Sequence, residues 1–436
     1  MSKVEQALQS ASETRALWIG QNILCRVPEL FNEQFSIRKA IIVADTITYG
    51  VAGKAVSAYL HNAAIEQEKP FIFTGSDLHS EIEHVERLEQ SLAQTDAIPV
   101  AVGSGTINDM TKLAAYRTNR QYLSVATAAS MDGYTAYGAS IVYQGNKQTF
   151  LCPAPQAVLA DLEIIRNAPA ELTASGYADL FAKVPAGADW ILADELGVER
   201  IDPKAWSIVQ DGLQDALSNP AGAHAGETEA IRQLIEGLML GGFAMQWSRT
   251  SRCASGAEHQ FSHLWDMEHH THNGIAPSHG FKVGIATLYI SALYEQLLHH
   301  PIEQLDIEAC CEQWPEWYQQ EAYIKEMFSG SDFLETALTE SRAKYISKNE
   351  LAQQMTLLKA KWPVIRTRLE KQLLPPSEVK RRLQLAGAPV EPEAIGISRD
   401  RLRNSFLRAQ CLRRRFTILD VAVRTACFNQ WLEKML

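Results

Sequence analysis

The sequence of 436 residues predicts an α/β domain built on a parallel sheet, followed by a domain made almost entirely of helices. Two observations lead to this fold class. Between residues 38 and 165, short apolar, β-rich runs alternate with helical patterns, and strands that alternate with helices form parallel sheets covered by helices. From about Ala168 onward, apolar positions recur at spacings of three and four residues and the β-rich runs stop, which indicates helices.

Five apolar, β-rich runs make up the predicted sheet, and helix-capping residues mark the starts of helices in the second half. Ser377, which follows two prolines, and Ser398 each stand at the start of a helical segment, the second running toward Leu436. We place the domain boundary between residues 166 and 167, which gives domains 1–166 and 167–436. The predicted strands are Lys39–Ala44, Phe71–Phe73, Ile98–Val102, Gln121–Ala126 and Ala157–Asp161.

Composition and charge exclude several classes of protein. With 46% hydrophobic residues the chain can bury real cores, and its formal charge of −10 argues against nucleic acid as a partner. Seven cysteines without a C-x-x-C pair predict neither a disulfide framework nor a four-thiolate zinc site, and fit a reducing cytoplasm. The start lacks the pattern of a signal peptide, and the most apolar stretch, Leu234–Trp247, is too short and interrupted to cross a membrane. We therefore expect a cytoplasmic protein without a membrane partner.

A glycine pair follows the third predicted strand. The segment Gly103-Ser-Gly-Thr-Ile-Asn-Asp109 leads directly into the helical run 110–117. Glycines allow a close backbone approach, and the free N–H groups of a helix start attract a pyrophosphate. Because Asn108 replaces the third glycine of G-x-G-x-x-G, a tight strand-to-helix turn without a ligand remains the alternative.

Asp45 closes the first predicted strand. A carboxylate at this end of a strand can accept hydrogen bonds from a ribose hydroxyl and repel a 2′-phosphate, which would favour NAD over NADP. The equally acceptable interpretation is an N-cap or turn aspartate that leads into Thr46.

Histidines concentrate in one segment of the second half. His259 and His263 are four residues apart and therefore lie on one face of a helix, where two imidazoles can meet one metal ion or one ligand, and His279 follows further on. A carboxylate would complete such a site. Asp179, inside an apolar helical stretch, needs a partner, which is either a metal ion or Lys183 four residues later.

Other chemically suggestive residues are interpreted as structural. His269, His270 and His272 are predicted to lie in a polar surface loop. The arginines of 413–415 resemble a phosphate clamp, but their helical spacing between Leu412 and Phe416 favours a solvated or intersubunit helix face. The cysteines at 310–311 are expected to pack in a helix.

Seven segments stand in a characteristic order along the chain: GSGTIND (103–109), SVATAASMDGYT (124–135), CPAPQAVLADL (152–162), SGYADLFAK (175–183), SRCASGAEHQFSH (251–263), SHGFKVG (278–284) and LRRRFTILD (412–420). Together they make the chain, from about residue 15 to its end, resemble the sn-glycerol-1-phosphate dehydrogenases. That family is grouped with the iron-containing alcohol dehydrogenases, glycerol dehydrogenases and dehydroquinate synthases.

The resemblance implies a dehydroquinate synthase-like fold, in which 1–166 binds NAD or NADP, 167–436 binds metal and substrate, and the active site lies in the cleft between them. It implies that a divalent metal is bound by Asp179, His259 and His279. It further implies that Asp132 and His263 are catalytic and that both, with Asp179, contact the substrate. Besides Asp45, the residues expected at the cofactor are Gly103, Ser104, Gly105, Thr106 and Ile107 at the pyrophosphate, and Thr127, Ala128, Ala129 and Ser130 along the nicotinamide.

The implied reaction interconverts sn-glycerol 1-phosphate and dihydroxyacetone phosphate by hydride transfer with NAD(P)(H). One carboxylate and two imidazoles leave a coordination position open, at which a metal can act as a Lewis acid on the C2 oxygen, with His263 as a proton carrier. Zinc is the expected metal, although iron and nickel also accept imidazole ligands. The substrate is a phosphorylated polyol, and we expect a homo-oligomer.

Two other functions remain open from the sequence. One is a dehydrogenase for glycerol or a related unphosphorylated polyol, and the other is a non-catalytic dinucleotide or metal sensor. Lys147, Arg252 and Lys282 are cations available for a phosphate. The chain departs from the family pattern at Ala136, where serine is usual, at Cys253, where proline is usual, and in the histidine-rich insert 265–277.

Overall fold

The structure is a computed structural model that describes residues 2–36, 38–75, 78–143 and 146–436. It contains two compact units. The first comprises Met1–Leu180, Lys204–Ser251 and Leu385–Gly387, and the second comprises Phe181–Pro203, Arg252–Gln384 and Ala388–Leu436. The elements after residue 161 are all helices, as the sequence predicts, but the helices between 204 and 251 cluster with the sheet rather than with the later helices. The functional division at 166/167 stays a prediction.

The first unit contains a six-stranded, entirely parallel sheet with strand order β1-β8-β5-β4-β2-β3. The five predicted strands are confirmed to within two residues. An edge strand and an antiparallel hairpin, β6 with β7, were not predicted. The strands are β1 (Ala16–Gly20), β2 (Ala40–Asp45), β3 (Phe71–Phe73), β4 (Ile98–Gly103), β5 (Leu123–Ala126), β6 (Ala139–Tyr143), β7 (Asn146–Phe150) and β8 (Ala157–Asp161).

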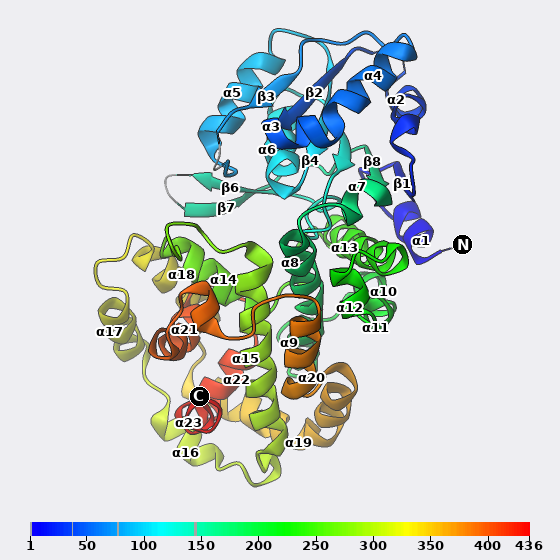
Figure 1. Ribbon diagram of the computed structural model, residues 1–436. Coiled ribbons are helices and arrows are strands. Elements are labelled where there is room, and N and C mark those ends of the chain that lie inside the picture. Colours follow the sequence, from blue (N-terminus) through cyan, green and yellow to red (C-terminus); the bar gives the residue numbers. More distant parts are fainter. Residues whose placement is uncertain (1, 37, 76–77, 144–145) are drawn as a thin grey trace. The chain divides into compact units, whose positions relative to one another are not determined.

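Both faces of the sheet are covered because side chains alternate along each strand. Ile42 and Val100 pack with α2 (Val27–Phe35) and α4 (Lys54–Asn62) on one face. On the other face, Val43 and Ala101 pack with α5 (Ile82–Leu92) and α6 (Gly105–Arg117) (Figure 1). Strands buried on both faces are apolar throughout, which is why the sequence reveals them as continuous runs.

The other helices grouped with the first unit, apart from single end residues, are α1 (Lys3–Gln9), α3 (Thr46–Thr48), α7 (Leu162–Arg166), α8 (Ala170–Phe181), α10 (Pro203–Gln210), α11 (Leu213–Ala216), α12 (Pro220–His224) and α13 (Thr228–Ser248). A π-helical turn at Tyr49–Gly53 and 3₁₀ turns at Leu24–Arg26, Ile302–Gln304 and Pro392–Ile395 complete the helical segments. No helix in the described ranges is long and apolar enough to span a membrane.

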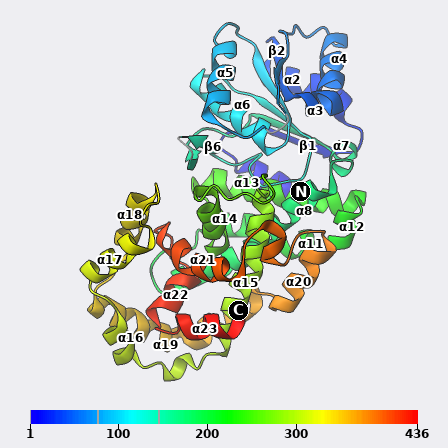
Figure 2. The same ribbon diagram turned by 60° about the vertical axis from the view of Figure 1, so that its left-hand side comes forward.

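The second unit consists of helices, among which α14 packs against α15 and α21 (Figure 2). The Ser398 side chain accepts the Arg401 N–H and caps α21, as predicted, but the segment that follows divides into three helices. The helices are α9 (Lys183–Glu195), α14 (Ala257–Met267), α15 (His279–His299), α16 (Ile307–Gln313), α17 (Trp317–Met327), α18 (Leu334–Lys344), α19 (Lys348–Gln372), α20 (Pro376–Leu385), α21 (Arg399–Cys411), α22 (Ile418–Arg424) and α23 (Phe428–Met435).

Candidate metal and cofactor sites

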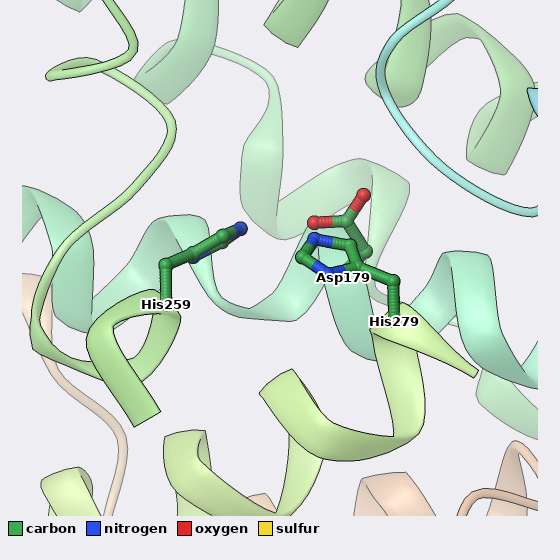
Figure 3. A group of neighbouring side chains, drawn as sticks. All are labelled: Asp179, His259 and His279. Atoms are coloured by element: carbon green, nitrogen blue, oxygen red, sulfur yellow. The ribbon is translucent and has the colours of Figure 1, made fainter. Parts of the chain in front are cut away.

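Three side chains that are far apart in sequence point toward one another (Figure 3). Asp179 on α8, His259 on α14 and His279 at the start of α15 each offer one ligand atom, and these atoms lie within 4.8 Å of one another. Asp179 and His259 are buried, and His279 is half-buried. One carboxylate and two imidazoles at this spacing form a donor set that a divalent transition metal accepts.

The second ring nitrogen of each histidine is already engaged. Nδ1 of His259 lies 2.7 Å from Oε1 of Glu258, which is fully buried, and Nδ1 of His279 lies 3.2 Å from Oγ of Ser262. A carboxylate can only accept from the imidazole, so His259 carries its proton on Nδ1 and offers Nε2. Sequence reasoning did not identify Glu258 or Ser262 as supporting residues, although each lies within three residues of His259.

A buried aspartate fixes the start of the helix that carries His259. Oδ2 of Asp189 on α9 accepts the N–H of Ala257 at 2.7 Å, and Oδ1 accepts the hydroxyl of Tyr294 at 2.6 Å and the N–H of Ile418 at 2.8 Å. These bonds connect α9 to α14, α15 and α22. Burial, followed by the nearby carboxylate of Glu258, raises the pKa of Asp189 to about 7.

The metal-group aspartate also contacts the segment that carries the predicted substrate residue. Oδ2 of Asp179 accepts the backbone N–H of Asp132 at 3.1 Å. Helix α8 comes this close because residue 176 is glycine: a Cβ there would lie 1.9 Å from the carbonyl oxygen of Ala129. Any side chain at Gly176 would push α8 away from the segment 127–132, so the glycine is a steric requirement.

The predicted cofactor residues stand at the carboxyl ends of neighbouring strands. Asp45 is the last residue of β2 and Gly103 the last of β4, and these strands pair through Val43 and Ala101. The chain passes from β2 to β3 on one side, while β4 and β5 lie on the other side, so the strand order reverses here. Ligands of open α/β sheets bind outside the carboxyl ends at such a reversal.

Two further features of this edge suit a phosphate and a nicotinamide. The side chain of Ser104 makes no capping hydrogen bond at the start of α6, so the first-turn N–H groups are not occupied by it. The segment Thr127–Ser130 follows β5, and the Thr127 N–H donates to the carbonyl of Gly103 at 3.1 Å. The two predicted cofactor segments are therefore neighbours, while their contact with a cofactor stays a prediction.

A buried lysine organises the segment that begins after Asp132. Nζ of Lys112 on α6 donates to the carbonyls of Gly133, Ala136 and Gly138 at 2.8, 2.9 and 3.0 Å. Oδ1 of Asp109 lies 3.8 Å from the same nitrogen and balances its charge, and burial raises the pKa of Asp109. This arrangement fixes the path of residues 133–138, including Ala136, where the family pattern usually has serine.

Asp45 acts as an N-cap in the structure. Its Oδ1 accepts the N–H groups of Ile47 and Thr48 at 2.8 and 2.7 Å, and the Thr48 hydroxyl accepts the N–H of Asp45 at 3.1 Å. These bonds use Oδ1 of Asp45, so the capping role is compatible with a contact to a ribose. That contact stays a prediction.

His263 is half-buried one turn after His259 and is not a member of the metal group.

The interpretation of His270 as a surface residue is wrong. His270 is buried: its Nε2 lies 2.6 Å from the Ile395 carbonyl, and its Nδ1 lies 2.8 Å from Nη1 of Arg401. Glu268 also pairs with Arg401 and Arg408, so this part of the insert is fastened to α21. His269, by contrast, is exposed, as predicted.

Two of the three cations considered for a phosphate have structural contacts. Nη2 of Arg252 donates to the carbonyl of Asp189 at 2.9 Å, and its Nε lies 3.2 Å from Glu199. Lys282 forms an ion pair with Asp266. Both side chains are buried, so neither offers an open cationic surface.

The arginines of 413–415 are not helical, contrary to the expectation, because they lie between α21 and α22.

Comparisons with known proteins agree with this fold. The family model for iron-containing alcohol dehydrogenases matches residues 18–169. A glycerol-1-phosphate dehydrogenase (NAD(P)+) of Halalkalibacterium halodurans is 34% identical over 293 residues, which are 67% of this chain and 73% of that protein. A protein of the same description from Geobacillus stearothermophilus is 29% identical over 385 residues, 87% of this chain and 85% of its own.

Solved structures resemble the chain over nearly its whole length. The crystal structure of a probable glycerol dehydrogenase from Sinorhizobium meliloti 1021 matches with a TM-score of 0.59 and 16% identity, over 97% of each chain. At that identity the match establishes the fold alone, and it confirms the predicted combination of an N-terminal parallel sheet with C-terminal helices.

Proposed function

Because the chain belongs to the glycerol-1-phosphate dehydrogenase family, within the group of iron-containing alcohol dehydrogenases, we propose that it interconverts sn-glycerol 1-phosphate and dihydroxyacetone phosphate by hydride transfer with NAD or NADP. The chain is an NAD(P)-dependent oxidoreductase that acts on a small molecule. The observation that supports a metal-dependent reaction is the convergence of Asp179, His259 and His279, with Nδ1 of both rings engaged elsewhere.

These three residues fit a divalent metal, and we propose zinc, with iron and nickel as alternatives. A metal bound there would supply Lewis-acid chemistry to the C2 oxygen of the substrate. His263, one helical turn after His259, would carry the proton that the C2 hydroxyl loses or gains. Asp132, whose N–H donates to Asp179, would contact the substrate from the adjoining segment.

The cofactor would lie at the carboxyl edge of the sheet. First-turn N–H groups within residues 103–107 would bind the pyrophosphate, and residues 127–130 would line the nicotinamide. Asp45, at the end of the neighbouring strand, would accept from the ribose. We also propose a cytoplasmic location, where the seven cysteines would stay reduced. A homo-oligomer is also proposed, and light scattering during gel filtration tests it.

The deciding experiment compares NADH and NADPH oxidation with dihydroxyacetone phosphate and with dihydroxyacetone on metal-reconstituted protein. We expect a higher kcat/KM for the phosphorylated ketone. A preference for dihydroxyacetone would instead support a polyol dehydrogenase, and metal and cofactor binding without turnover of either ketone would support a sensor.

A further inference from the structure

Three consecutive arginines lie in the short connection between α21 and α22, outside both helices. Buried Leu412 and Phe416 anchor the two ends of this connection, so the arginines between them are held in place. The capping box of Thr417 and Asp420 then begins α22 immediately afterwards. A cationic segment of fixed position is therefore built between two packed helices.

The middle arginine has a carboxylate partner of its own. Nη2 of Arg414 lies 2.6 Å from Oε1 of Glu340, and the Arg414 backbone N–H donates to the other carboxylate oxygen at 2.7 Å. Its charge is thus balanced within the protein. Arg414 is therefore a matched control for its two neighbours.

The third arginine approaches the helix that carries the metal-group histidine. Nη1 of Arg415 donates to the carbonyl of Ser255 at 2.5 Å, and the carbonyl of Arg415 lies 3.5 Å from Nε2 of Gln260. Ser255 precedes α14 and Gln260 directly follows His259. Arg415 therefore lies beside the first turn of α14.

Positive charge gathers at this position. Burial, followed by the guanidinium groups of Arg252 and Arg413, lowers the pKa of Arg415 to about 10, so it remains charged at neutral pH. The side chain of Arg413 is exposed, and no carboxylate in the described ranges lies within 4.0 Å of it to form an ion pair. The carboxylates of Glu199 and Glu258 partly offset the repulsion at Arg415, and Glu340 attracts Arg413 from beyond ion-pair distance. An anion from solution would bind the exposed guanidinium group of Arg413 directly.

We propose that Arg413, supported by Arg415, binds the phosphate group of the substrate, an inference that rests on the function proposed above. A phosphate monoester carries one to two negative charges, and a guanidinium group can bind it through two parallel hydrogen bonds. The phosphorus of dihydroxyacetone phosphate is three bonds from C2, the carbon whose oxygen would face the group at His259. Arg415 donates to the carbonyl of a residue that precedes α14, the helix that carries His259, and Arg413 lies two residues earlier in the same connection.

The test measures the ratio of kcat/KM for dihydroxyacetone phosphate to that for dihydroxyacetone in the metal-reconstituted wild type and in the variants Arg413→Gln, Arg413→Lys and Arg414→Gln. Loss of one charged hydrogen-bonding group predicts a fall of about 10- to 100-fold in this ratio for Arg413→Gln, with partial rescue by lysine. Arg414→Gln, whose side chain pairs with Glu340, should keep the wild-type ratio. Inorganic phosphate should also inhibit Arg413→Gln less than the wild type.

The outcomes test the phosphate subsite and the proposed reaction separately. An unchanged ratio in Arg413→Gln, or an equal fall in Arg414→Gln, would overturn the phosphate subsite while leaving the proposed reaction intact. A wild-type preference for dihydroxyacetone would overturn the proposed reaction itself. Thermal melting in the presence of inorganic phosphate gives a readout that is independent of turnover: phosphate should raise the Tm of the wild type more than that of Arg413→Gln.

Discussion

Replacing Glu258 with glutamine should weaken metal binding about 10- to 100-fold, because outer residues that orient a metal-ligating histidine have effects of this size. Oε1 of Glu258 lies 2.7 Å from Nδ1 of His259 and also accepts the Gly256 N–H at 2.6 Å, and the side chain is fully buried. Hydrogen bonds to a charged group contribute about 1.5–3 kcal/mol. At about 1.4 kcal/mol per factor of ten, this range agrees with the expected loss of affinity.

Ser262 provides a graded comparison within the same group. Its hydroxyl lies 3.2 Å from Nδ1 of His279, and neither partner needs to carry a charge. A neutral hydrogen bond contributes about 0.5–1.5 kcal/mol, so Ser262→Ala should weaken metal binding by about tenfold or less. Glu258→Gln should therefore have the larger effect, although both variants leave all three proposed ligands in place.

The assay is competition for zinc between the protein and a chromophoric chelator, with circular dichroism to verify that each variant keeps its helices. His259→Ala, which removes a proposed ligand, should lose both metal and activity and sets the scale for complete loss. An unchanged Kd in Glu258→Gln, with His259→Ala losing the metal, would refute the positioning role. A larger effect of Ser262→Ala would refute the argument from charge.

Three further predictions concern pH, cofactor choice and the metal. Burial lowers the pKa of His270 below its ordinary value near 6.5. The contribution of neutral His270 to stability is therefore present above that pH and is lost as the pH falls through the lower, folded-state pKa. Urea unfolding between pH 7 and pH 5 should show a smaller loss of unfolding free energy in His270→Gln than in the wild type. Asp45→Ser keeps a capping hydroxyl but removes the charge, so kcat/KM with NADP should rise relative to NAD, and an unchanged ratio would leave only the capping role. Mild chelation should stop turnover but preserve the helical circular dichroism signal and NADH binding, because helices on this scale do not need a metal to fold; collapse of the helical signal, or activity after complete metal removal, would contradict this.

The sheet could be predicted from sequence wherever strands are covered on both faces. β2 and β4 lie at the centre of the sheet, and their apolar runs are continuous. β1 pairs with β8 alone, and its residues after Ala16 are only half-buried, so the hydrophobic signal is weak. The hairpin β6–β7 lies outside the sheet and has little continuous apolar character, which explains why it was not recognised.

The candidate site was accessible to sequence reasoning only in part. Helical spacing identifies the shared face of His259 and His263, but no local pattern relates Asp179 to residues 80 and 100 positions away. The resemblance to a family supplied that grouping. Glu258 does have a local signal in the sequence, since a glutamate directly before a predicted ligand on a largely apolar helix face must find a partner if it is buried.

The connection at 413–415 has the spacing of a helix without being one, because Leu412 and Phe416, four residues apart, are the buried ends of a non-helical segment. A capping box was visible in the sequence, since Thr417 and Asp420 have the spacing that begins a new helix and thereby ends the preceding one. Periodicity counted across this point therefore joined two separate helices.

His270 illustrates a different limit of sequence reasoning. Its neighbours Glu268, His269 and Thr271 are all polar, and such a run ordinarily indicates a solvated surface. The structure buries His270 because both ring nitrogens find partners more than 120 residues further along the chain, at Ile395 and Arg401. A polar side chain can be buried at low cost when its hydrogen bonds are satisfied. The segments that satisfy them are brought together only by the packing of α14 against α21, so exposure here is a tertiary property that local composition does not determine.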